Sequence, residues 1–209
     1  MRIAIPKKTV YRLSVYLRCL ERFAENGIRT ASSHALAQAA GVKPTQLRKD
    51  LTGFGHLGTR GLGYEVAKLR DKIAEVLGRT QLQPVVLVGV GHLGSALLAY
   101  KGFEKESFEI IAGFDVDVKR KRRKTYNQTI YPLDRLETFV CQQKIRMAII
   151  TVPTAAAQDV ANRLIAAGVN AILNFAPVVL HVPSNVVVSN VNLAIELENL
   201  SYFRSLAES

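Results

Sequence analysis

Two short segments share the glycine pattern G-x-G-x-x-G: GFGHLG at residues 53–58 and GVGHLG at residues 89–94. This spacing binds the pyrophosphate of a dinucleotide when it joins a strand to a helix. One glycine permits a tight turn, the next lets the backbone approach the phosphates, and the last allows close packing of helix on strand. The surroundings of each copy therefore decide whether it can perform this chemistry.

The second copy has the required surroundings. Residues 84–88 form a short, wholly apolar run that predicts a buried parallel strand, and residues 95–100 are expected to open a helix directly after Gly94. A second apolar run, 109–114, ends at Asp115, 21 residues after Gly94, close to the spacing at which a carboxylate binds ribose hydroxyls. We predict a dinucleotide site that includes Asp115. Its predicted loop residues are Gly89, Val90, Gly91, His92, Leu93 and Gly94.

Alternation of strands and helices continues beyond that site. Strands are predicted at 147–152 and 171–173, with a helix at 155–167 between them. This order predicts a doubly wound parallel sheet, the Rossmann fold, whose ligands lie beyond the carboxyl ends of the strands. Ordinary turn chemistry is the alternative interpretation of the residues at those strand ends. The candidates for the nicotinamide side are Thr151, Val152, Pro153, Asn174, Ala176 and Pro177.

The first copy has different surroundings. It follows a polar, charged segment, and five glycines occur within residues 53–63 without opening a helix. That composition favours a hairpin with Thr59 and Arg60 at its tip. We expect a DNA-facing wing, with Arg60 in the minor groove or against phosphate.

Three helices are predicted before this hairpin, at 10–24, 34–40 and 45–51, with Thr45 as the cap of the third. A tight turn with glycine separates the second from the third, as in a helix-turn-helix. On the third helix, Arg48 and Lys49 could reach guanine edges or phosphates, and Gln46 could read adenine.

Charge supports a nucleic-acid partner for the N-terminal part. Residues 1–80 contain 15 Lys and Arg against 6 Asp and Glu, a net charge of +9, whereas residues 81–209 contain 13 against 11, a net charge of +2. A basic domain attached to a nearly neutral one is typical of a DNA-binding module joined to another function. A solvated basic surface without a partner is the alternative.

The rest of the chain excludes several classes of protein. No apolar run approaches the roughly 18 to 20 residues of a membrane span, so we expect a cytoplasmic protein without a membrane partner. Cys19 and Cys141 lie far apart, which predicts two buried small hydrophobic residues and no metal site. His181 is the only histidine beyond the second glycine loop, and no carboxylate is paired with it in the sequence, so no catalytic residue is predicted.

Several segments together resemble the Rex family of bacterial redox-sensing transcriptional repressors: PTQLRKDLTGFGHLGTRGLGY, VVLVGVGHLGSAL, GFDVD, TVP and NFAPVVL, in this order. The resemblance covers almost the whole chain. It implies an α/β protein with a winged helix-turn-helix domain at 1–80, a Rossmann NAD(H)-binding domain at 81–190 and a dimerisation helix at 191–209. It also implies a homodimer that exchanges this terminal helix, binds a palindromic operator and is released from it by NADH.

The resemblance extends the predicted sites. Arg18 and Tyr100 lie where the family couples cofactor state to domain orientation, and Asn192 lies where the family usually has an aspartate. Asn192 therefore lacks the carboxylate that the resemblance associates with redox switching. A basic run, 119–124, follows Asp115 and could tolerate the 2′-phosphate of NADP, which would weaken the selection of NAD over NADP. A solvated loop is the other interpretation of this run. The full set of predicted DNA contacts is Ser33, Gln46, Arg48, Lys49, Gly55, His56, Thr59, Arg60 and Gly61.

Two other functions compete with this one. A nucleotide-dependent oxidoreductase with a basic accessory domain would need an acid or base beside the nicotinamide. A Rossmann-type nucleotide or acyl-CoA binding regulator would lack redox discrimination. For the repressor, we expect NADH and NAD to favour different angles between subunits, of which only one spaces the two recognition helices correctly on DNA.

Overall fold

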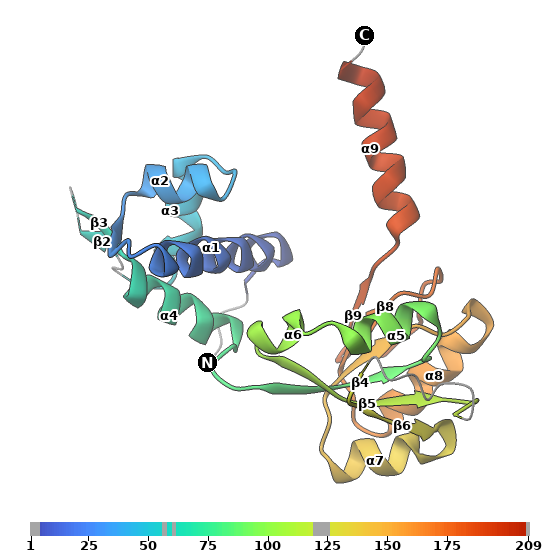
Figure 1. The fold of residues 1–209 in the computed structure, drawn as a ribbon. Coiled ribbons are helices and arrows are strands. Elements are labelled where there is room, and N and C mark those ends of the chain that lie inside the picture. The colour runs from blue at the N-terminus through green and yellow to red at the C-terminus, as the bar shows by residue number, and fades with distance from the viewer. Residues whose placement is uncertain (1–4, 56–57, 60–61, 119–125, 208–209) are drawn as a thin grey trace. The chain divides into compact units, whose positions relative to one another are not determined.

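The computed structural model describes residues 5–55, 58–59, 62–118 and 126–207 (Figure 1). The chain divides into two compact units, Met1–Gln81 and Leu82–Ser209. Each unit is described by itself.

Unit 1 combines four helices with a small antiparallel sheet. Strand β3 lies in the middle of this sheet and pairs with β1 on one side and with β2 on the other. Helix, strand, two helices and a two-stranded hairpin, in that order, make a winged helix. The elements are α1 (Lys7–Glu25), β1 (Thr30–Ala31), α2 (Ser33–Ala39), α3 (Pro44–Thr52), β2 (Gly58–Thr59), β3 (Gly63–Glu65) and α4 (Val66–Leu77).

The core of unit 1 forms where apolar faces of the helices meet. Leu13 and Leu20 of α1 are fully buried, as are Leu36 of α2, Leu47 of α3 and Leu69 of α4. These five side chains belong to one cluster, so α2 and α3 share a core with α1 and α4. Burial of each leucine stabilises the unit by roughly 1.5–3 kcal/mol before entropy is counted.

The start of α3 differs from the prediction. Pro44 takes the first helical position and Lys43 is the N-cap residue, so Thr45 is not the cap. Proline suits this position because its fixed φ is helical and its missing N–H would have had no partner there. The cap of α2 is Ser32, whose Oγ accepts a hydrogen bond of 3.0 Å from Ala35 N.

Unit 2 is a six-stranded parallel sheet in the order β6-β5-β4-β7-β8-β9. The first strand of the unit lies in the middle, and the order reverses between β4 and β7, as in the Rossmann fold. The strands are β4 (Gln83–Val88), β5 (Phe108–Asp115), β6 (Thr129–Pro132), β7 (Met147–Ile150), β8 (Ala171–Asn174) and β9 (Val187–Asn190). The helices are α5 (His92–Ala99), α6 (Gly102–Lys105), the 3-10 turn η2 (Leu133–Arg135), α7 (Leu136–Gln142), α8 (Thr154–Ala166) and α9 (Leu193–Ala207).

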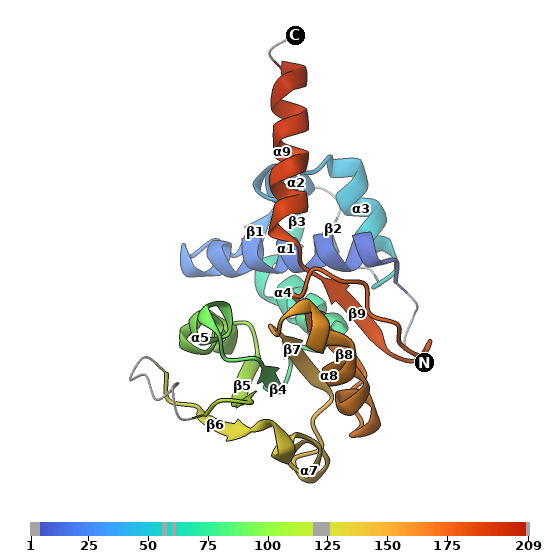
Figure 2. The same ribbon diagram turned by 90° about the vertical axis from the view of Figure 1, so that its right-hand side faces the viewer.

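Helices cover both faces of this sheet (Figure 2). Alternate residues of β4 point to opposite faces: Val86 packs with Val140 of α7 and Val160 of α8, whereas Leu87 packs in a second cluster with Leu98 of α5. Burial on both faces explains why β4 is continuously apolar from Val85 to Val88 instead of alternating.

Several elements of unit 2 differ from the predicted ones. Helix α5 begins at His92 and not at Ser95, so Gly94 lies inside the helix. Strands β6 and β9 and helix α7 were not predicted. Cys141 of α7 is exposed, which corrects the expected burial of both cysteines; Cys19 is buried.

Helix α9 leaves the sheet after β9 (Figure 1), and its apolar side chains are exposed. Leu193, Leu197, Leu200 and Phe203 are each about two-thirds exposed. A helix with this much exposed apolar surface needs another surface to cover it. Within the described residues, no helix combines the length and apolar character that a membrane span needs.

Candidate functional site

The second glycine loop connects the end of β4 to the start of α5 and is tightly packed. Gly89 has φ +97°, and a Cβ there would lie 2.8 Å from the carbonyl group of Thr151. A Cβ on Gly94 would lie 2.1 Å from the carbonyl oxygen of Gly89. Only glycine allows the helix, the loop and the neighbouring strand end to approach this closely.

The outer side of the same loop is open. A Cβ on Gly91 would meet no atom of the described chain within 4 Å, and Gly91 is the N-cap residue of α5. His92 and Leu93, which follow it, are exposed. The first amides of a helix have no partner within the helix and carry its positive dipole end, so this opening fits a phosphate group.

Asp115, at the carboxyl end of β5, lies beside the loop. Its Oδ2 accepts a 2.6 Å hydrogen bond from Val90 N, and its Oδ1 accepts one of 2.9 Å from Asp117 N. The carboxylate is nearly buried, whereas the next side chain, Val116, is 83% exposed. The position suits recognition of an adjacent ribose by the carboxylate, with an apolar surface next to it for a purine ring.

The segment after β7 lies across the point where the strand order reverses. Thr151 N donates to Val88 O at 2.9 Å, and its hydroxyl donates to Gly89 O at 2.6 Å. The hydroxyl therefore holds the glycine loop and does not point outward. Val152 is half-buried and Pro153 is exposed, so these two present the outer surface of the segment.

Asn174 organises the segment after β8. Its Nδ2 donates to the carbonyl oxygens of Ala176 and Val178 and to Oδ1 of Asn190, each at 3.0 Å, and its Oδ1 accepts from Ala176 N at 3.0 Å. The side chain is fully buried. Asn174 thus shapes this loop from within, and the exposed Pro177 is the part of the segment that faces outward.

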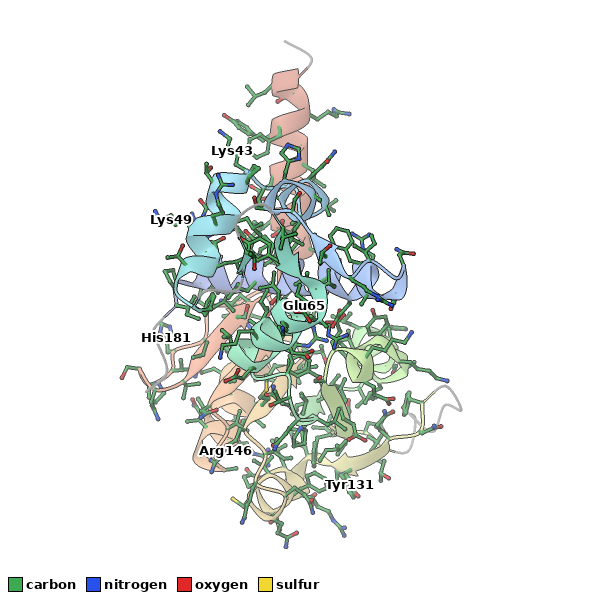
Figure 3. All side chains as sticks on the ribbon, turned by 90° about the vertical axis from the view of Figure 1, so that its left-hand side faces the viewer. Lys43, Lys49, Glu65, Tyr131, Arg146 and His181 are labelled. Atoms are coloured by element: carbon green, nitrogen blue, oxygen red, sulfur yellow. The ribbon has the colours of Figure 1, made fainter. Side chains whose placement is uncertain are left out.

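Exposed cations of unit 1 include a group on α3 and at its start. Arg48 and Lys49 are exposed, and Arg48 Nη1 donates to Ser33 Oγ at 3.1 Å, which joins α3 to the start of α2. Lys43, exposed at the N-cap of α3, adds a cation that the sequence analysis missed; Figure 3 shows Lys43 and Lys49 pointing away from the unit.

The wing is described in part. Strands β2 and β3 pair antiparallel, with Thr59 opposite Gly63, and Leu62 N donates to Thr59 O at 3.1 Å. The predicted contacts His56, Arg60 and Gly61 lie outside the described residues. The predicted contacts Gly55 and Thr59, which are described, are exposed, as a DNA-facing hairpin requires.

Gln46 is placed differently from the other residues predicted on α3. Its Nε2 donates to Asp50 Oδ1 at 2.8 Å on the side of α3 that packs on α1. The amide is therefore engaged inside unit 1 and not directed outward to read adenine. Arg48 and Lys49 remain the outward-facing pair.

Comparison with known proteins identifies the family. Residues 4–52 match the family "Putative DNA-binding protein N-terminus", and residues 80–178 match the family "CoA binding domain". The redox-sensing transcriptional repressor Rex of Carboxydothermus hydrogenoformans is 48% identical over 198 residues, which cover 95% of this chain and 95% of that protein. The chain belongs to the Rex family.

Solved Rex-family structures also match over the full length. RSP in complex with beta-NAD+ and operator DNA has a TM-score of 0.91 at 33% identity and covers 99% of this chain and 95% of its own. RSP in complex with beta-NADH has a TM-score of 0.86 at 32% identity and covers 99% of this chain and 97% of its own.

Three residues were assigned to redox coupling from the Rex resemblance. Arg18 lies on α1 of unit 1 and is exposed. Tyr100 caps α5 in unit 2, is 61% exposed and makes an edge contact with Phe103 at 5.0 Å between ring centroids. Asn192 Oδ1 accepts from Ala194 N at 3.0 Å, which caps the start of α9. Asparagine is a favoured helix-capping residue, so Asn192 has a structural role at the start of α9.

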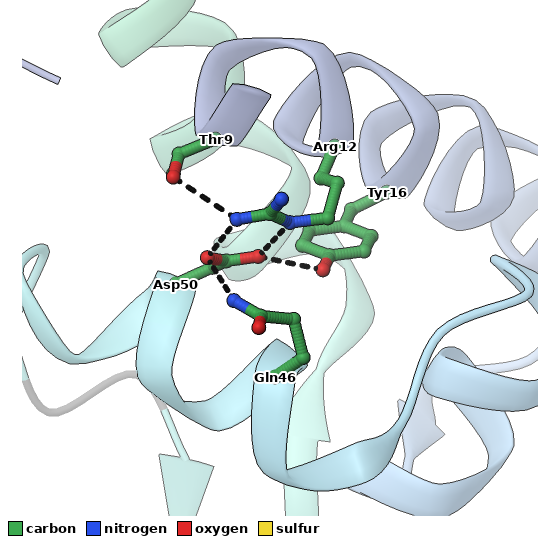
Figure 4. Close-up of polar contacts among 5 residues, drawn as sticks. All are labelled: Thr9, Arg12, Tyr16, Gln46 and Asp50. Atoms are coloured by element: carbon green, nitrogen blue, oxygen red, sulfur yellow. Dashed lines mark hydrogen bonds and ion pairs between the residues drawn. The ribbon is translucent and has the colours of Figure 1, made fainter. Parts of the chain in front are cut away.

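Unit 1 also contains a buried polar group that was not predicted from the sequence (Figure 4). The Asp50 cluster consists of Arg12, Tyr16, Gln46 and Asp50. Arg12 donates to both carboxylate oxygens of Asp50, at 2.6 and 2.7 Å, and Tyr16 OH donates at 2.8 Å. The signal in the sequence was the helical spacing: residue 50 follows the buried Leu47 by three positions and so falls on the buried face.

The charge of this cluster is well defined. Burial alone would raise the pKa of Asp50, but hydrogen bonds from Arg12, Tyr16 and Gln46 outweigh it and lower the pKa below its usual value. Burial, together with the hydrogen bond to Asp50, raises the pKa of Tyr16. Asp50 is therefore ionised and Tyr16 protonated at neutral pH. Among the described residues, no group of three or more His, Cys, Asp or Glu side chains could hold a metal ion.

Proposed function

We propose that this chain is a homodimeric transcriptional repressor that binds a palindromic DNA operator through unit 1 and NAD(H) through unit 2, and that NADH releases the operator. The full-length similarity to RSP bound to beta-NAD+ and operator DNA carries the proposal. The basic N-terminal part and the glycine loop of unit 2 support it from the chemistry of the residues. A DNA operator also implies residence in the cytoplasm.

The adenosine and pyrophosphate side of the dinucleotide site is at the carboxyl ends of β4 and β5. The amides of His92 and Leu93 bind the pyrophosphate over the open side of Gly91, and Asp115 accepts hydrogen bonds from the adenosine ribose. Val116 packs against the adenine. A carboxylate at this position repels a phosphorylated ribose, which favours NAD(H) over NADP(H). The basic run 119–124, which could oppose this selection, lies outside the described residues.

The nicotinamide side is formed by the outer surfaces of two loops. Val152 and Pro153 follow β7, and Pro177 follows β8, whereas the predicted contact Ala176 is buried in the core of unit 2. The Thr151 hydroxyl holds the glycine loop and the Asn174 amide holds the loop after β8, so neither side chain needs to contact the cofactor itself. When bound, NADH and NAD+ present the same phosphates but differ in the charge and shape of the nicotinamide ring.

The DNA site combines direct contacts with the wing. Arg48 and Lys49 enter the major groove, Ser33 and Lys43 contact phosphates near it, and the hairpin around Arg60 contacts the minor groove. The net charge of +9 on residues 1–80 attracts the duplex over a distance of about a Debye length.

The response to NADH is a shift between two arrangements of the dimer. The exposed apolar surface of α9 is covered by the other subunit, so the exchanged helices fix the angle between subunits. Arg18, Tyr100 and the helix start at Asn192 couple the nicotinamide side to that angle. Only the arrangement that spaces both recognition helices for two half-sites binds tightly.

The match of residues 80–178 to the "CoA binding domain" family supports a second candidate, a CoA-binding regulator without redox discrimination. The Asp115 carboxylate argues against it, because the ribose of CoA carries a phosphate. An oxidoreductase would need an acid or base at the nicotinamide. His181, the one histidine of unit 2 beyond the glycine loop, uses its backbone N–H and carbonyl oxygen to pair with Gln158, and no enzymatic role is proposed for it.

Binding measurements distinguish these candidates. We expect the purified protein to bind NADH at least tenfold more tightly than NADPH, and CoA more weakly still, in isothermal titration calorimetry at fixed salt. Incubation of NADH with the protein should leave NADH unoxidised when pyruvate or acetaldehyde is added. Tighter binding of CoA than of NADH would favour the second candidate, and turnover of NADH would favour an enzyme.

A further inference from the structure

We propose that Asp50 is a positioning residue for operator recognition: its carboxylate fixes the rotation of α3 on α1 and thereby the direction in which Arg48 and Lys49 face DNA. The inference rests on the proposed function. It assigns a role to a side chain that cannot itself reach DNA, because Asp50 is 7% exposed.

The hydrogen bonds that converge on Asp50 come from two helices. Arg12 and Tyr16 belong to α1, and Gln46 belongs to α3 itself, one turn before Asp50. Arg12 also donates to Thr9 Oγ1 at 3.0 Å, which holds the guanidinium plane in place (Figure 4). A bidentate arginine–carboxylate pair has a narrow range of favourable geometry. The Asp50 cluster therefore restricts rotation of α3 about its own axis.

Apolar packing alone would restrict that rotation less. Leu47 and Leu51 on the same side of α3 are buried, but apolar contacts are non-directional and tolerate small rotations. Side-chain groups lie roughly 6 Å from a helix axis, so a rotation of about 20° moves them by about 2 Å. That displacement is enough to break hydrogen bonds, which require donor–acceptor distances of about 2.7–3.2 Å.

Arg48, Lys49 and Asp50 are consecutive on α3, so the direction in which one side chain leaves the helix axis determines the directions of the other two. Successive residues of an α-helix are separated by about 100°. With Asp50 directed to α1, Lys49 and Arg48 are directed away from it, and both are exposed. The Arg48–Ser33 hydrogen bond restrains α3 from the α2 side. Asp50 thus acts on base recognition through the direction of its two neighbours.

The Asp50→Asn variant gives a test because the charge effect and the positioning effect predict opposite changes in affinity for the operator. The substitution removes a negative charge from a basic unit, so general electrostatics predicts tighter DNA binding. Positioning predicts weaker binding to the operator. Asp71→Asn is the matched control, because it removes an exposed carboxylate of the same unit, whose partner is the adjacent Arg70.

Binding would be measured by fluorescence anisotropy with two duplexes at one salt concentration. The first is a palindromic duplex selected with the wild-type protein from a randomised pool, and the second is its scrambled counterpart. For Asp50→Asn we expect affinity for the selected duplex to fall about tenfold or more, which corresponds to about 1.4 kcal/mol. Affinity for the scrambled duplex should stay equal or rise slightly, as for Asp71→Asn.

Stability is separated from positioning by two further measurements. Circular dichroism melting would establish that each variant is folded at the assay temperature, and NADH binding would report on unit 2. Tyr16→Phe keeps the ring and all charges and removes one hydrogen bond to Asp50; we expect a loss of about threefold for the selected duplex only. This variant provides the test if Asp50→Asn does not fold.

Three results would overturn the inference. The first is that Asp50→Asn binds the selected duplex as tightly as Asp71→Asn does. The second is that Asp50→Asn loses affinity for the selected and the scrambled duplex equally. The third applies when Asp50→Asn is unfolded: Tyr16→Phe binds the selected duplex with wild-type affinity. Failure of the wild type to prefer any duplex over its scrambled counterpart would instead contradict the proposed function.

Discussion

The Asp115→Asn variant tests the dinucleotide site at the residue that recognises the ribose. The substitution keeps the size of the side chain. Its single oxygen can accept the hydrogen bond from Val90 N, but the hydrogen bond from Asp117 N is then lost because an amide nitrogen takes the place of the second oxygen. It removes the negative charge that strengthens hydrogen bonds from ribose hydroxyls. A hydrogen bond to a charged group contributes about 1.5–3 kcal/mol, against about 0.5–1.5 for a neutral one. The difference is about 1–2 kcal/mol, or roughly 5- to 30-fold in Kd.

The assay is isothermal titration calorimetry, in which NADH or NADPH is titrated into the protein. We expect NADH affinity to fall by this factor and the preference for NADH over NADPH to narrow, because the repulsion of the 2′-phosphate is removed as well. Operator affinity without cofactor should stay at the wild-type value, since Asp115 lies in unit 2.

Glu104→Gln is the control for the change of charge. Glu104 is exposed on α6, before the N-terminal end of β5, whereas Asp115 is at the carboxyl end of that strand. Glu104→Gln should bind both nucleotides like the wild type. An Asp115→Asn protein whose NADH affinity lies within twofold of the control would refute the assignment of Asp115 to the ribose.

Three further predictions follow from single contacts. Gly94→Ala places a Cβ 2.1 Å from Gly89 O, so we expect the variant to destabilise unit 2 by about 1–3 kcal/mol in thermal melting. We also expect it to abolish NADH binding in calorimetry. A Gly94→Ala protein that is as stable as the wild type and binds NADH would contradict the loop geometry. Arg48→Ala should cost about 1–3 kcal/mol for the operator and much less for scrambled DNA in anisotropy titrations, and an equal loss for both would assign Arg48 to phosphate alone. The pKa of Asp50 is lowered in the folded protein, so the stability that its carboxylate contributes is present above the unfolded pKa of 3.8 and is lost as pH falls through the folded pKa. The difference in unfolding free energy between wild type and Asp50→Asn, measured by urea titration, should therefore shrink below about pH 4. A difference that is constant from pH 7 to pH 3 would contradict an ionised Asp50.

The sequence predicted those elements whose pattern is locally complete. The apolar β4 next to the glycine loop, and β5 ending at Asp115, are buried strands with distinct boundaries. The helices of unit 1 follow from apolar spacing and capping residues. Their faces are set by burial, which leaves a strong periodic pattern in the chain.

Edge strands and short strands were not predictable from local pattern. Strand β9 lies at the edge of the sheet, with Val187 67% exposed, and it is defined by its pairing with β8 across the sheet. The first turn of α5 contains Gly94, which favours a loop when only local sequence is considered. Packing against β4 and Thr151 determines the helix there, and that information is non-local.

Side-chain partners were the least predictable part of the candidate site. Gln46 has the residue type of a base-reading side chain, but its amide contacts Asp50. Asn174 was expected beside the nicotinamide, and its amide is engaged within its own loop. Cys141 is exposed because α7 buries Leu136 and Val140 on its other face. Each of these depends on which direction an element faces, and a sequence pattern does not give that direction for a polar residue.

The central claim is that NADH and NAD+ have different effects on operator binding. The direct measurement is a titration of the selected palindromic duplex with the protein alone, with NAD+ and with NADH, at one salt concentration and one protein concentration. We predict that the complex persists with NAD+ and is released by NADH, with a shift in apparent Kd of at least tenfold between the two. Equal effects of NAD+ and NADH on the Kd would contradict redox sensing by this protein.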